Sequence, residues 1–254
     1  MSRSLQGCRV LVTRERPGEL AAKLVERGAT VIHVPLIAVV EAEDGGAALR
    51  DALSGLADYD WLVVTSPAGS ERVGAAVRLA PEVRLATVGT TTAAVLERES
   101  GRPVDLIPPV QRAEGLAAAF IAEARSPQRV LLAQADIAAP TLADALRRAG
   151  HDVTAVIAYR TVPLEPDPGA VSGADAVLFA SGSSVESWCR AFGAGSAPPL
   201  VVVIGPTTAA AAEEFGLKVS AVATDHSLDG LVTELERLCA ETGSARGIRS
   251  PRPD

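Results

Sequence analysis

The sequence predicts an α/β protein made of two similar parallel-sheet lobes joined by a two-stranded β-ladder. Short apolar runs that fit buried strands alternate along the chain with helical segments that carry one apolar face. One motif, an apolar run followed by Gly-x-x-Thr and an alanine-rich helix, occurs at 85–94 and again at 201–210. The order of elements in the first half of the chain also recurs in the second half, which indicates a duplicated fold.

The composition is that of a protein with a large aliphatic core. The chain has 254 residues, of which 48% are hydrophobic, enough for one large domain or two of ordinary size. A net charge of −7 argues against a nucleic-acid partner. Three widely spaced cysteines (Cys8, Cys189 and Cys239) give neither a disulfide framework nor a metal-ligand pattern. We find no signal peptide and no run long enough to span a membrane, so we expect a cytoplasmic protein without a metal.

The first half of the chain reads as alternating strands and helices. Apolar runs predict strands at 8–13, 30–34, 60–65 and 84–88, with further extended segments at 36–43 and 104–107. Helical spacing of apolar residues, as in Leu20, Leu24 and Val25, predicts helices at 18–27, 47–56, 70–79, 91–99 and 113–124. Gly28 suits the end of the first helix, and Pro35 ends the second strand.

The second half follows the same plan. The same criteria predict strands at 129–133, 152–157, 175–180, 200–204 and 219–222, with an extended segment at 158–165. They predict helices at 141–148, 184–192, 207–215 and 228–239. Residues 242–254 are polar and lack periodicity, so we predict that this tail is disordered.

The repeat suggests how the chain divides into lobes. Residues 10–14 match 130–134, and residues 60–66 match 175–181. The extended segments 36–43 and 158–165 are the natural crossing points, and we assign them to the connecting β-ladder. One lobe then combines residues 1–35 with 166–241, and the other contains residues 44–157.

Six polar turns are predicted at the carboxyl ends of strands, where open parallel sheets bind their ligands. Glycine permits a tight turn there, threonine can cap the helix that follows, and free amides at a helix N-terminus favour an anion. We expect the turns to line a cleft between the lobes that suits a ligand with several carboxylates or phosphates. They are Thr13-Arg14, Thr65-Ser66, 89–92, Ala133-Gln134, 181–184 and 205–208.

Several of these turns, taken in order, resemble the uroporphyrinogen-III synthase family. The resemblance covers about residues 8–240 and rests on the ordered set 10–14, Thr65-Ser66, Val88-Gly89-x-x-Thr92-Ala93, Ala158-Tyr159-Arg160-Thr161, Ser181-x-x-Ser184 and Ile204-Gly205-x-x-Thr208-Ala209. It implies a bilobed protein that closes the linear tetrapyrrole hydroxymethylbilane, which carries eight carboxylates, to uroporphyrinogen III. The ring A hydroxyl leaves, a spiro intermediate forms and ring D is inverted, without a metal or organic cofactor. We expect a monomer.

The resemblance also suggests roles for individual residues. It puts Tyr159 near the leaving hydroxyl, and the matching position in the first half is Ile37, so the duplication is broken there. We expect Tyr159 to assist departure of the hydroxyl; the alternative is a packed tyrosine with a satisfied hydroxyl. A phenol is a weak acid at neutral pH, so a Tyr159→Phe enzyme should keep part of its activity. We assign substrate binding to Arg14, Thr65, Ser66, Gly89, Thr92, Ser181, Ser184, Gly205 and Thr208.

Each binding assignment has a plainer alternative. The threonines and serines could serve only as helix caps, and Arg14 could be an ordinary surface residue. No serine has a histidine or acid partner at a recognisable spacing, which argues against a nucleophilic serine. The sequence also departs from the family at Gln134 and Ala139, where relatives often carry arginine. A non-catalytic bilobed module that binds a small anion or serves a regulatory role is therefore the alternative function.

Overall fold

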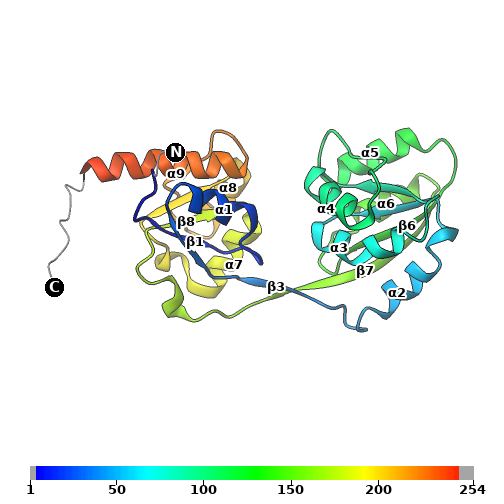
Figure 1. The fold of residues 1–254 in the computed structure, drawn as a ribbon, viewed down its shortest axis with the longest axis horizontal. Helices are drawn as coiled ribbons and strands as arrows, with labels where there is room; N and C mark the ends of the chain where they lie inside the picture. The colour runs from blue at the N-terminus through cyan, green and yellow to red at the C-terminus, as the bar shows by residue number, and fades with distance from the viewer. Residues whose placement is uncertain (1–3, 246–254) are drawn as a thin grey trace. The chain divides into compact units, whose positions relative to one another are not determined.

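The computed structural model describes residues 4–245, and the chain divides into two units. Unit 1 combines residues 1–38 with 163–254, and unit 2 contains residues 39–162. In Figure 1, blue elements from the start of the chain and yellow to red elements from its end share unit 1, while cyan and green elements form unit 2. Residues 246–254 of the predicted disordered tail lie outside the described part of the chain.

Unit 1 is built on a parallel sheet in the order β10-β9-β8-β1-β2. Its strands are β1 (Arg9–Val12), β2 (Thr30–His33), β8 (Ala176–Phe179), β9 (Leu200–Val203) and β10 (Ala221–Val222). Its helices are α1 (Gly18–Glu26), α7 (Gly182–Phe192), α8 (Pro206–Glu214) and α9 (Leu228–Ala245), with short 3₁₀ turns at Pro168–Val171 and Ala194–Ser196. All residues of β8 are buried, as the continuous apolar run predicts for a strand covered on both faces.

Two helices cover each face of this sheet. Leu20 of α1 and Leu231 of α9 pack with Val10 and Val12 of β1. Trp188 of α7 and Ala212 of α8 pack in a second cluster with Leu11, Val177 and Val201 from the opposite face. The alternation of Val10, Leu11 and Val12 between the two clusters is the two-residue period of a strand.

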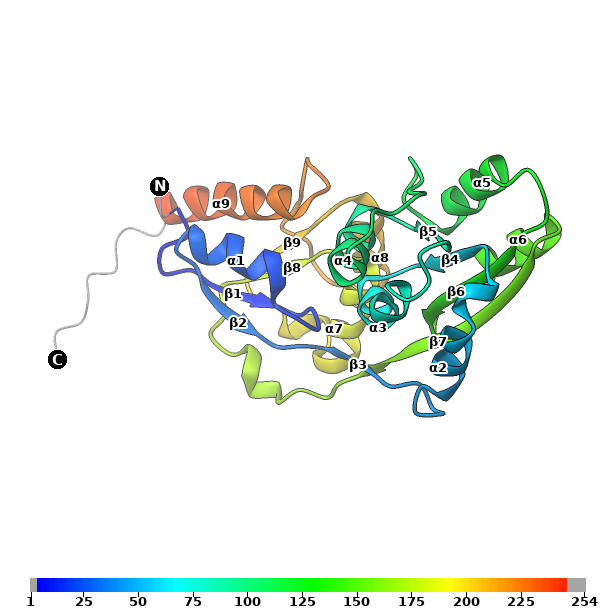
Figure 2. The same cartoon turned by 45° about the vertical axis from the view of Figure 1, so that its right-hand side comes forward.

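Unit 2 has a second sheet, in the order β3-β7-β6-β4-β5. Its strands are β3 (Ile37–Val40), β4 (Trp61–Val64), β5 (Arg84–Thr87), β6 (Arg129–Ala135) and β7 (Asp152–Pro163). Its helices are α2 (Ala47–Ser54), α3 (Pro67–Val77), α4 (Thr90–Ser100), α5 (Ala113–Glu123) and α6 (Thr141–Arg148), with a 3₁₀ turn at Leu56–Asp58. Helices α3 and α4 pack side by side against one face (Figure 2), and α5 and α6 cover the other.

The two sheets share one strand order, which confirms the predicted fold class. The unit 1 order β9-β8-β1-β2 corresponds to β5-β4-β6-β7 in unit 2, and all these pairs are parallel. In unit 1 the edge strand β10 lies beside β9. At the corresponding edge of unit 2, beside β5, the strand predicted at 104–107 is reduced to a single bridge between Ala86 and Leu106.

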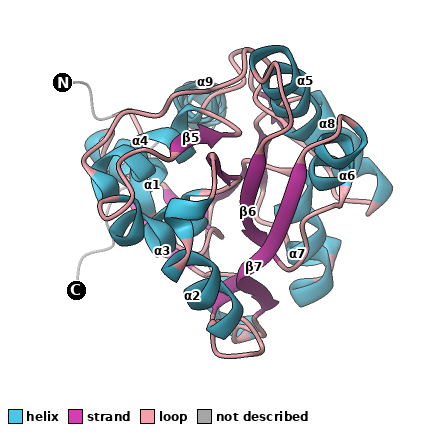
Figure 3. Cartoon of the chain, turned by 90° about the vertical axis from the view of Figure 1, so that its right-hand side faces the viewer, coloured by secondary structure: helices cyan, strands magenta, loops and turns pink. Residues whose placement is uncertain are grey.

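The chain passes between the units at β3 and β7, which are neighbours in the sheet. The unit boundaries lie after Ala38 and after Val162. The backbone N–H of Leu164 donates to the carbonyl of Leu36 at 2.9 Å. The strand predicted at 152–157 and the extended segment at 158–165 merge into the single strand β7, which lies beside β6 in Figure 3.

Some predicted boundaries were wrong. Helix α9 continues to Ala245, so residues 242–245 are helical and not disordered. Helix α3 begins at Pro67 and not at residue 70, because Ser66 caps it and proline fits the first helical position. Helix α7 likewise begins at Gly182, directly after its cap Ser181.

Candidate functional site

Tyr159 and Ser66 meet at the carboxyl end of the unit 2 sheet. Tyr159 is 7% exposed, and its hydroxyl donates to Oγ of Ser66 at 2.8 Å. Ser66 has extended backbone and is the N-cap of α3, and its Oγ also accepts from the backbone N–H of Gly69 at 3.1 Å. The structure therefore joins the expected acid and one expected binding residue in a single hydrogen-bonded group at a helix N-terminus.

A bulge in β7 turns Tyr159 into this position. The register with β6 runs to Gln134 opposite Ile157 and then shifts, so that Ala135 is opposite Tyr159. Alternate residues of a strand face opposite sides, yet Val156, Ala158 and Tyr159 all pack in one cluster because of this extra residue. The backbone N–H of Asp136 donates to the carbonyl of Tyr159 at 3.0 Å and fixes the bulge.

Arg72 of α3 lies over the ring of Tyr159. Its guanidinium carbon is 5.2 Å from the ring centroid, and Nη1 donates to the carbonyl of Ala68 at 2.9 Å. The Nε atom is buried and has no hydrogen-bond partner within residues 4–245. Sequence reasoning missed Arg72, since only the register of β7 reveals which residue of α3 faces the tyrosine.

Gly89 and Thr92 begin helix α4 in the same unit. Gly89 is the N-cap of α4 and has no side chain that could accept a hydrogen bond, so the prediction that a threonine caps this helix was wrong. Instead, Oε1 of Gln111 accepts from the backbone N–H of Thr90 at 3.0 Å and from its hydroxyl at 3.3 Å. A Cβ on residue 89 would lie 2.5 Å from that oxygen, so any larger residue would displace the end of the Gln111 side chain. Thr92 is 4% exposed.

Unit 1 repeats this arrangement with a different side chain. Gly205 is the N-cap of α8, again without a side-chain cap, and Thr208 is buried. The ring of His226 takes the place that Gln111 has in unit 2, since a Cβ on residue 205 would lie 3.3 Å from its Cδ2. Gln111 lies two residues before α5, and His226 lies two residues before α9. Comparison of the two halves of the sequence could therefore have identified them as corresponding residues.

Ser181 and Ser184, the two serines of unit 1 that are predicted to bind substrate, form a helix cap. Oγ of Ser181 accepts from the backbone N–H of Ser184 at 3.2 Å, and the hydroxyl of Ser184 donates to the carbonyl of Ser181 at 2.6 Å. Ser181 is therefore the N-cap of α7, which matches the plainer alternative for this pair. A capping role leaves the other amides of the first turn available to a ligand.

The end of β1 is polar as expected. Thr13 is 3% exposed, and its hydroxyl has no hydrogen-bond partner in the described part of the chain. Arg14 is exposed, and its carbonyl lies 2.8 Å from Nε2 of His33. In unit 2, Thr65 is half-buried after β4, Gln134 is half-buried in β6 and Ala139 is exposed.

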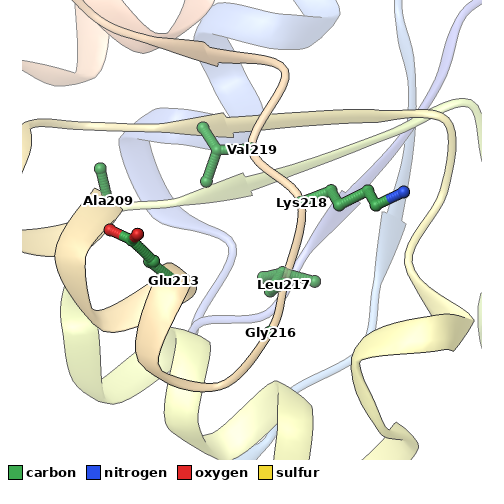
Figure 4. Close-up of a pocket in the computed structure, with 6 residues that line it drawn as sticks. All are labelled: Ala209, Glu213, Gly216, Leu217, Lys218 and Val219. Atoms are coloured by element: carbon green, nitrogen blue, oxygen red, sulfur yellow. The ribbon is translucent and has the colours of Figure 1, made fainter.

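A pocket of about 430 Å³ lies elsewhere in unit 1, between α8 and the loop that leads to β10 (Figure 4). Its lining includes one acid, Glu213, and one base, Lys218. It contains none of the residues predicted to bind substrate. It lies toward the C-terminal end of α8, whereas Gly205 is at the helix N-terminus.

The ionisable groups Cys8, Cys239 and His151, whose pKa values are shifted, lie away from the polar turns at the carboxyl ends of the strands. The sulfur atoms of Cys8 and Cys239 are 3.8 Å apart in unit 1. Their hydrogen bond and burial both raise the pKa of Cys8. The same hydrogen bond lowers the pKa of Cys239, against the opposing effect of burial. In unit 2, burial lowers the pKa of His151, whose Nδ1 accepts from the backbone N–H of Gln128 at 3.2 Å.

Residues 4–245 contain neither a candidate metal site nor a candidate membrane span. Within them, no group of three or more His, Cys, Asp or Glu residues is placed to hold a metal ion. No helix in this part of the chain has both the length and the apolar character needed to cross a membrane.

The fold and these strand ends define a class: a duplicated α/β protein whose two parallel sheets each end in polar turns and helix N-termini. The family model described as "Uroporphyrinogen-III synthase HemD" matches residues 18–233. The chain belongs to this family, which consists of enzymes of tetrapyrrole biosynthesis.

Individual relatives agree with this assignment. The chain is 28% identical to a uroporphyrinogen-III synthase of Synechococcus elongatus, over 94% of this chain and 98% of the relative. It is 30% identical to a chloroplastic uroporphyrinogen-III synthase of Oryza sativa subsp. japonica, over 89% of this chain and 79% of the relative.

Solved structures show the same fold at low identity. A mutant uroporphyrinogen III synthase of Thermus thermophilus matches with a TM-score of 0.59 at 20% identity, over 93% of this chain and 100% of that one. A uroporphyrinogen-III synthetase of Helicobacter pylori matches with a TM-score of 0.60 at 14% identity, over 91% of this chain and 99% of that one.

Proposed function

We propose that this enzyme cyclises hydroxymethylbilane to uroporphyrinogen III, with loss of the ring A hydroxyl as water and inversion of ring D. Family membership supports the reaction, and one observation supports where it occurs. The hydroxyl of Tyr159 donates to Ser66, which itself caps helix α3 at the carboxyl end of the sheet. An acid at that position can protonate the leaving hydroxyl of a substrate held by neighbouring amides.

The proton path follows from the hydrogen-bonding capacity of Ser66. A serine hydroxyl has one proton and two lone pairs. Oγ of Ser66 accepts from Tyr159 and from the N–H of Gly69, so its own proton is directed to a third group. In the proposed reaction this group is the leaving hydroxyl: it takes the proton of Ser66 and departs as water, while Tyr159 passes its own proton to Ser66. Tyr159 recovers a proton after ring D has been inverted, when the previously unsubstituted α-carbon of that ring loses its hydrogen.

Positioning contributes more than acid catalysis in this proposal. A phenol is a weak acid at neutral pH, so Tyr159 accelerates the departure of water only in part. The larger task is to fold a flexible linear tetrapyrrole so that the correct pyrrole carbon meets the electrophilic carbon of ring A. The reaction as proposed uses no metal or organic cofactor.

Uncharged donors are proposed to hold the carboxylates of the substrate. In unit 2 these are the first turns of α3 and α4, with Thr65, Ser66, Gly89 and Thr92. In unit 1 they are the first turns of α7 and α8, with Ser181, Ser184, Gly205 and Thr208. The cationic side chain of Arg14 is proposed to bind a carboxylate beside them. Helix N-termini attract anions through free N–H groups and the helix dipole. This suits an acidic protein in which Gln134 and Ala139 carry no charge.

A product assay tests the proposal. Hydroxymethylbilane is supplied to the purified enzyme, and the uroporphyrin isomers are separated after oxidation. We expect mainly type III product, against type I from spontaneous closure in the control without enzyme. Type I product alone would overturn the proposal and leave a protein that binds anions without chemistry.

We also propose that the enzyme is a cytoplasmic monomer. Light scattering coupled to size-exclusion chromatography should give a mass near 26.1 kDa. A mass of twice that value would contradict the monomer. Fractionation of cells that express the protein should place it with cytoplasmic markers.

A further inference from the structure

Three arginines in the described part of unit 2 lie over aromatic rings. The pairs are Arg72 over Tyr159 at 5.2 Å, Arg84 over Trp61 at 4.0 Å and Arg129 over Tyr59 at 5.4 Å. Arg84 and Arg129 are the first residues of β5 and β6, at the amino end of the sheet. Arg72 is at the carboxyl end, beside the proposed proton path. All three are arginine–aromatic contacts, but only that of Arg72 lies near the candidate site.

Arg72 is held firmly over the ring. Its Nη1 donates to the carbonyl of Ala68, one turn earlier in α3, at 2.9 Å. Its buried Nε finds no acceptor within residues 4–245. A buried donor without an acceptor is unfavourable, and the electron-rich face of an aromatic ring is the remaining favourable contact. The contact with Tyr159 and the hydrogen bond to Ala68 therefore both favour this conformation of Arg72.

We propose that Arg72 is a positioning residue for Tyr159. The guanidinium fixes the ring so that its hydroxyl points to Ser66, and its charge stabilises the negative charge that develops on the phenol oxygen. This inference rests on the proposed function, in which Tyr159 gives its proton to Ser66 as Ser66 gives its own to the leaving hydroxyl. The C–O bond of the substrate breaks, water leaves and Tyr159 carries the charge until the closing ring returns a proton.

Two properties suit Arg72 to this role. Arginine remains protonated at every working pH, so its charge does not depend on conditions. Arg72 is only partly exposed and Tyr159 is buried, so water and salt screen their interaction less than they would at the surface.

Kinetics of matched variants test the role. Arg72→Met keeps a long apolar side chain and removes the charge; we expect kcat to fall about tenfold while KM stays within about twofold. Arg72→Lys restores the charge, and we expect it to recover part of kcat. Arg129→Met removes the equivalent contact with Tyr59 and should behave as the wild type. An unchanged kcat in Arg72→Met, or a loss seen only in KM, would overturn the proposal.

A double variant shows whether Arg72 acts through the phenol. In a Tyr159→Phe background no charge develops on the ring, so Arg72→Met should lower kcat no further. Additive losses in the double variant would mean that Arg72 acts independently of Tyr159, which contradicts the proposal.

A spectroscopic readout is independent of activity. The chain has two tyrosines, so the enzyme labelled with 3-fluorotyrosine should give two ¹⁹F resonances. Arg72→Met should shift the Tyr159 resonance, and Arg129→Met that of Tyr59. If the Tyr159 resonance is unchanged in both Arg72→Met and Arg72→Lys, the proposal that Arg72 positions Tyr159 is refuted. This conclusion holds whether or not the enzyme makes type III product. Absence of type III product from the wild type would refute the proposed function alone.

Discussion

The side-chain oxygen of Gln111 lies 3.0 Å from the backbone nitrogen of Thr90. The N-terminus of α4 therefore already has a neutral acceptor where we propose that a substrate carboxylate binds. In unit 1 the ring of His226 lies against the corresponding glycine. A carboxylate that binds to the first turn of α4 has to displace Gln111 from the amide of Thr90.

Replacing Gln111 should separate these two roles. Gln111→Ala removes an acceptor from a helix N-terminus, so the free energy of unfolding should fall by about 1 kcal/mol. The free amide should then bind substrate more readily, with KM about threefold lower. Urea unfolding and steady-state kinetics measure the two effects. The exposed Gln6→Ala is the control and should change neither; a higher KM in Gln111→Ala would indicate that Gln111 itself binds substrate.

Removing the Tyr159 hydroxyl should slow the reaction without abolishing it. In Tyr159→Phe the proton path loses its source, and we expect kcat about tenfold lower with type III still the main product. Tyr59→Phe changes the other tyrosine and should leave kcat unchanged. A switch to type I product in Tyr159→Phe would mean that this hydroxyl directs ring inversion as well.

Cys8 and Cys239 should form a disulfide under a thiol oxidant such as diamide. Their sulfur atoms are 3.8 Å apart, and the lowered pKa of Cys239 makes it the attacking thiolate. The bond would close a long loop in the unfolded chain, so Tm should rise by about 5 °C or more. Free-thiol titration should fall from three groups to one. Cys189→Ser should still form the bond, whereas Cys8→Ser should not; oxidation of the wild type without loss of thiols would contradict the prediction.

Stability should fall as the pH drops below the range where His151 is neutral. Burial lowers its pKa in the folded state, so the unfolded chain binds the proton more tightly. The contribution of this group is complete above the unfolded pKa of about 6.5 and is lost progressively below it. Urea unfolding between pH 5 and 8 should show a decline that is weaker in His151→Gln. An equal decline in His151→Gln and the exposed control His33→Gln would show that other groups cause it.

Gly74 should tolerate no side chain. A Cβ at this position of α3 would lie 2.3 Å from Cβ of Glu99 in α4 and 3.1 Å from its backbone. The two helices would have to separate, which should lower the free energy of unfolding by about 2 kcal/mol or more. Gly55→Ala is the control, because its nearest neighbour would be a side-chain oxygen at 3.7 Å. Equal stability of the two variants would contradict the close α3–α4 contact.

The sequence predicted the layout because the strands are short uninterrupted apolar runs, such as Ala176–Phe179, and the helices follow at regular intervals. The errors arose where local signals compete. Ser66-Pro67 starts a helix three residues before the apolar spacing becomes visible, and Gly243 weakens the helical signal in a segment that α9 nevertheless includes.

The candidate site was predictable only in part. Tyr159 and Ser66 were identified by resemblance, but their hydrogen bond depends on the bulge in β7, which shifts the pairing of β7 with β6. Arg72 and Gln111 reach the site through tertiary contacts between elements, and neither carries a local motif. Their identification required the three-dimensional register.

The interleaving of unit 1 sets an order for folding during synthesis on the ribosome. Strand β1 pairs with β2 on one side and with β8 on the other, and β8 is not translated until residue 176. Unit 2 ends at residue 162, so a nascent chain can complete it while β1 still has one open edge. The first 38 residues therefore cannot complete their sheet until the last third of the polypeptide has been synthesised. Throughout that interval, the edge of β1 that later pairs with β8 is unpaired and exposed to other chains.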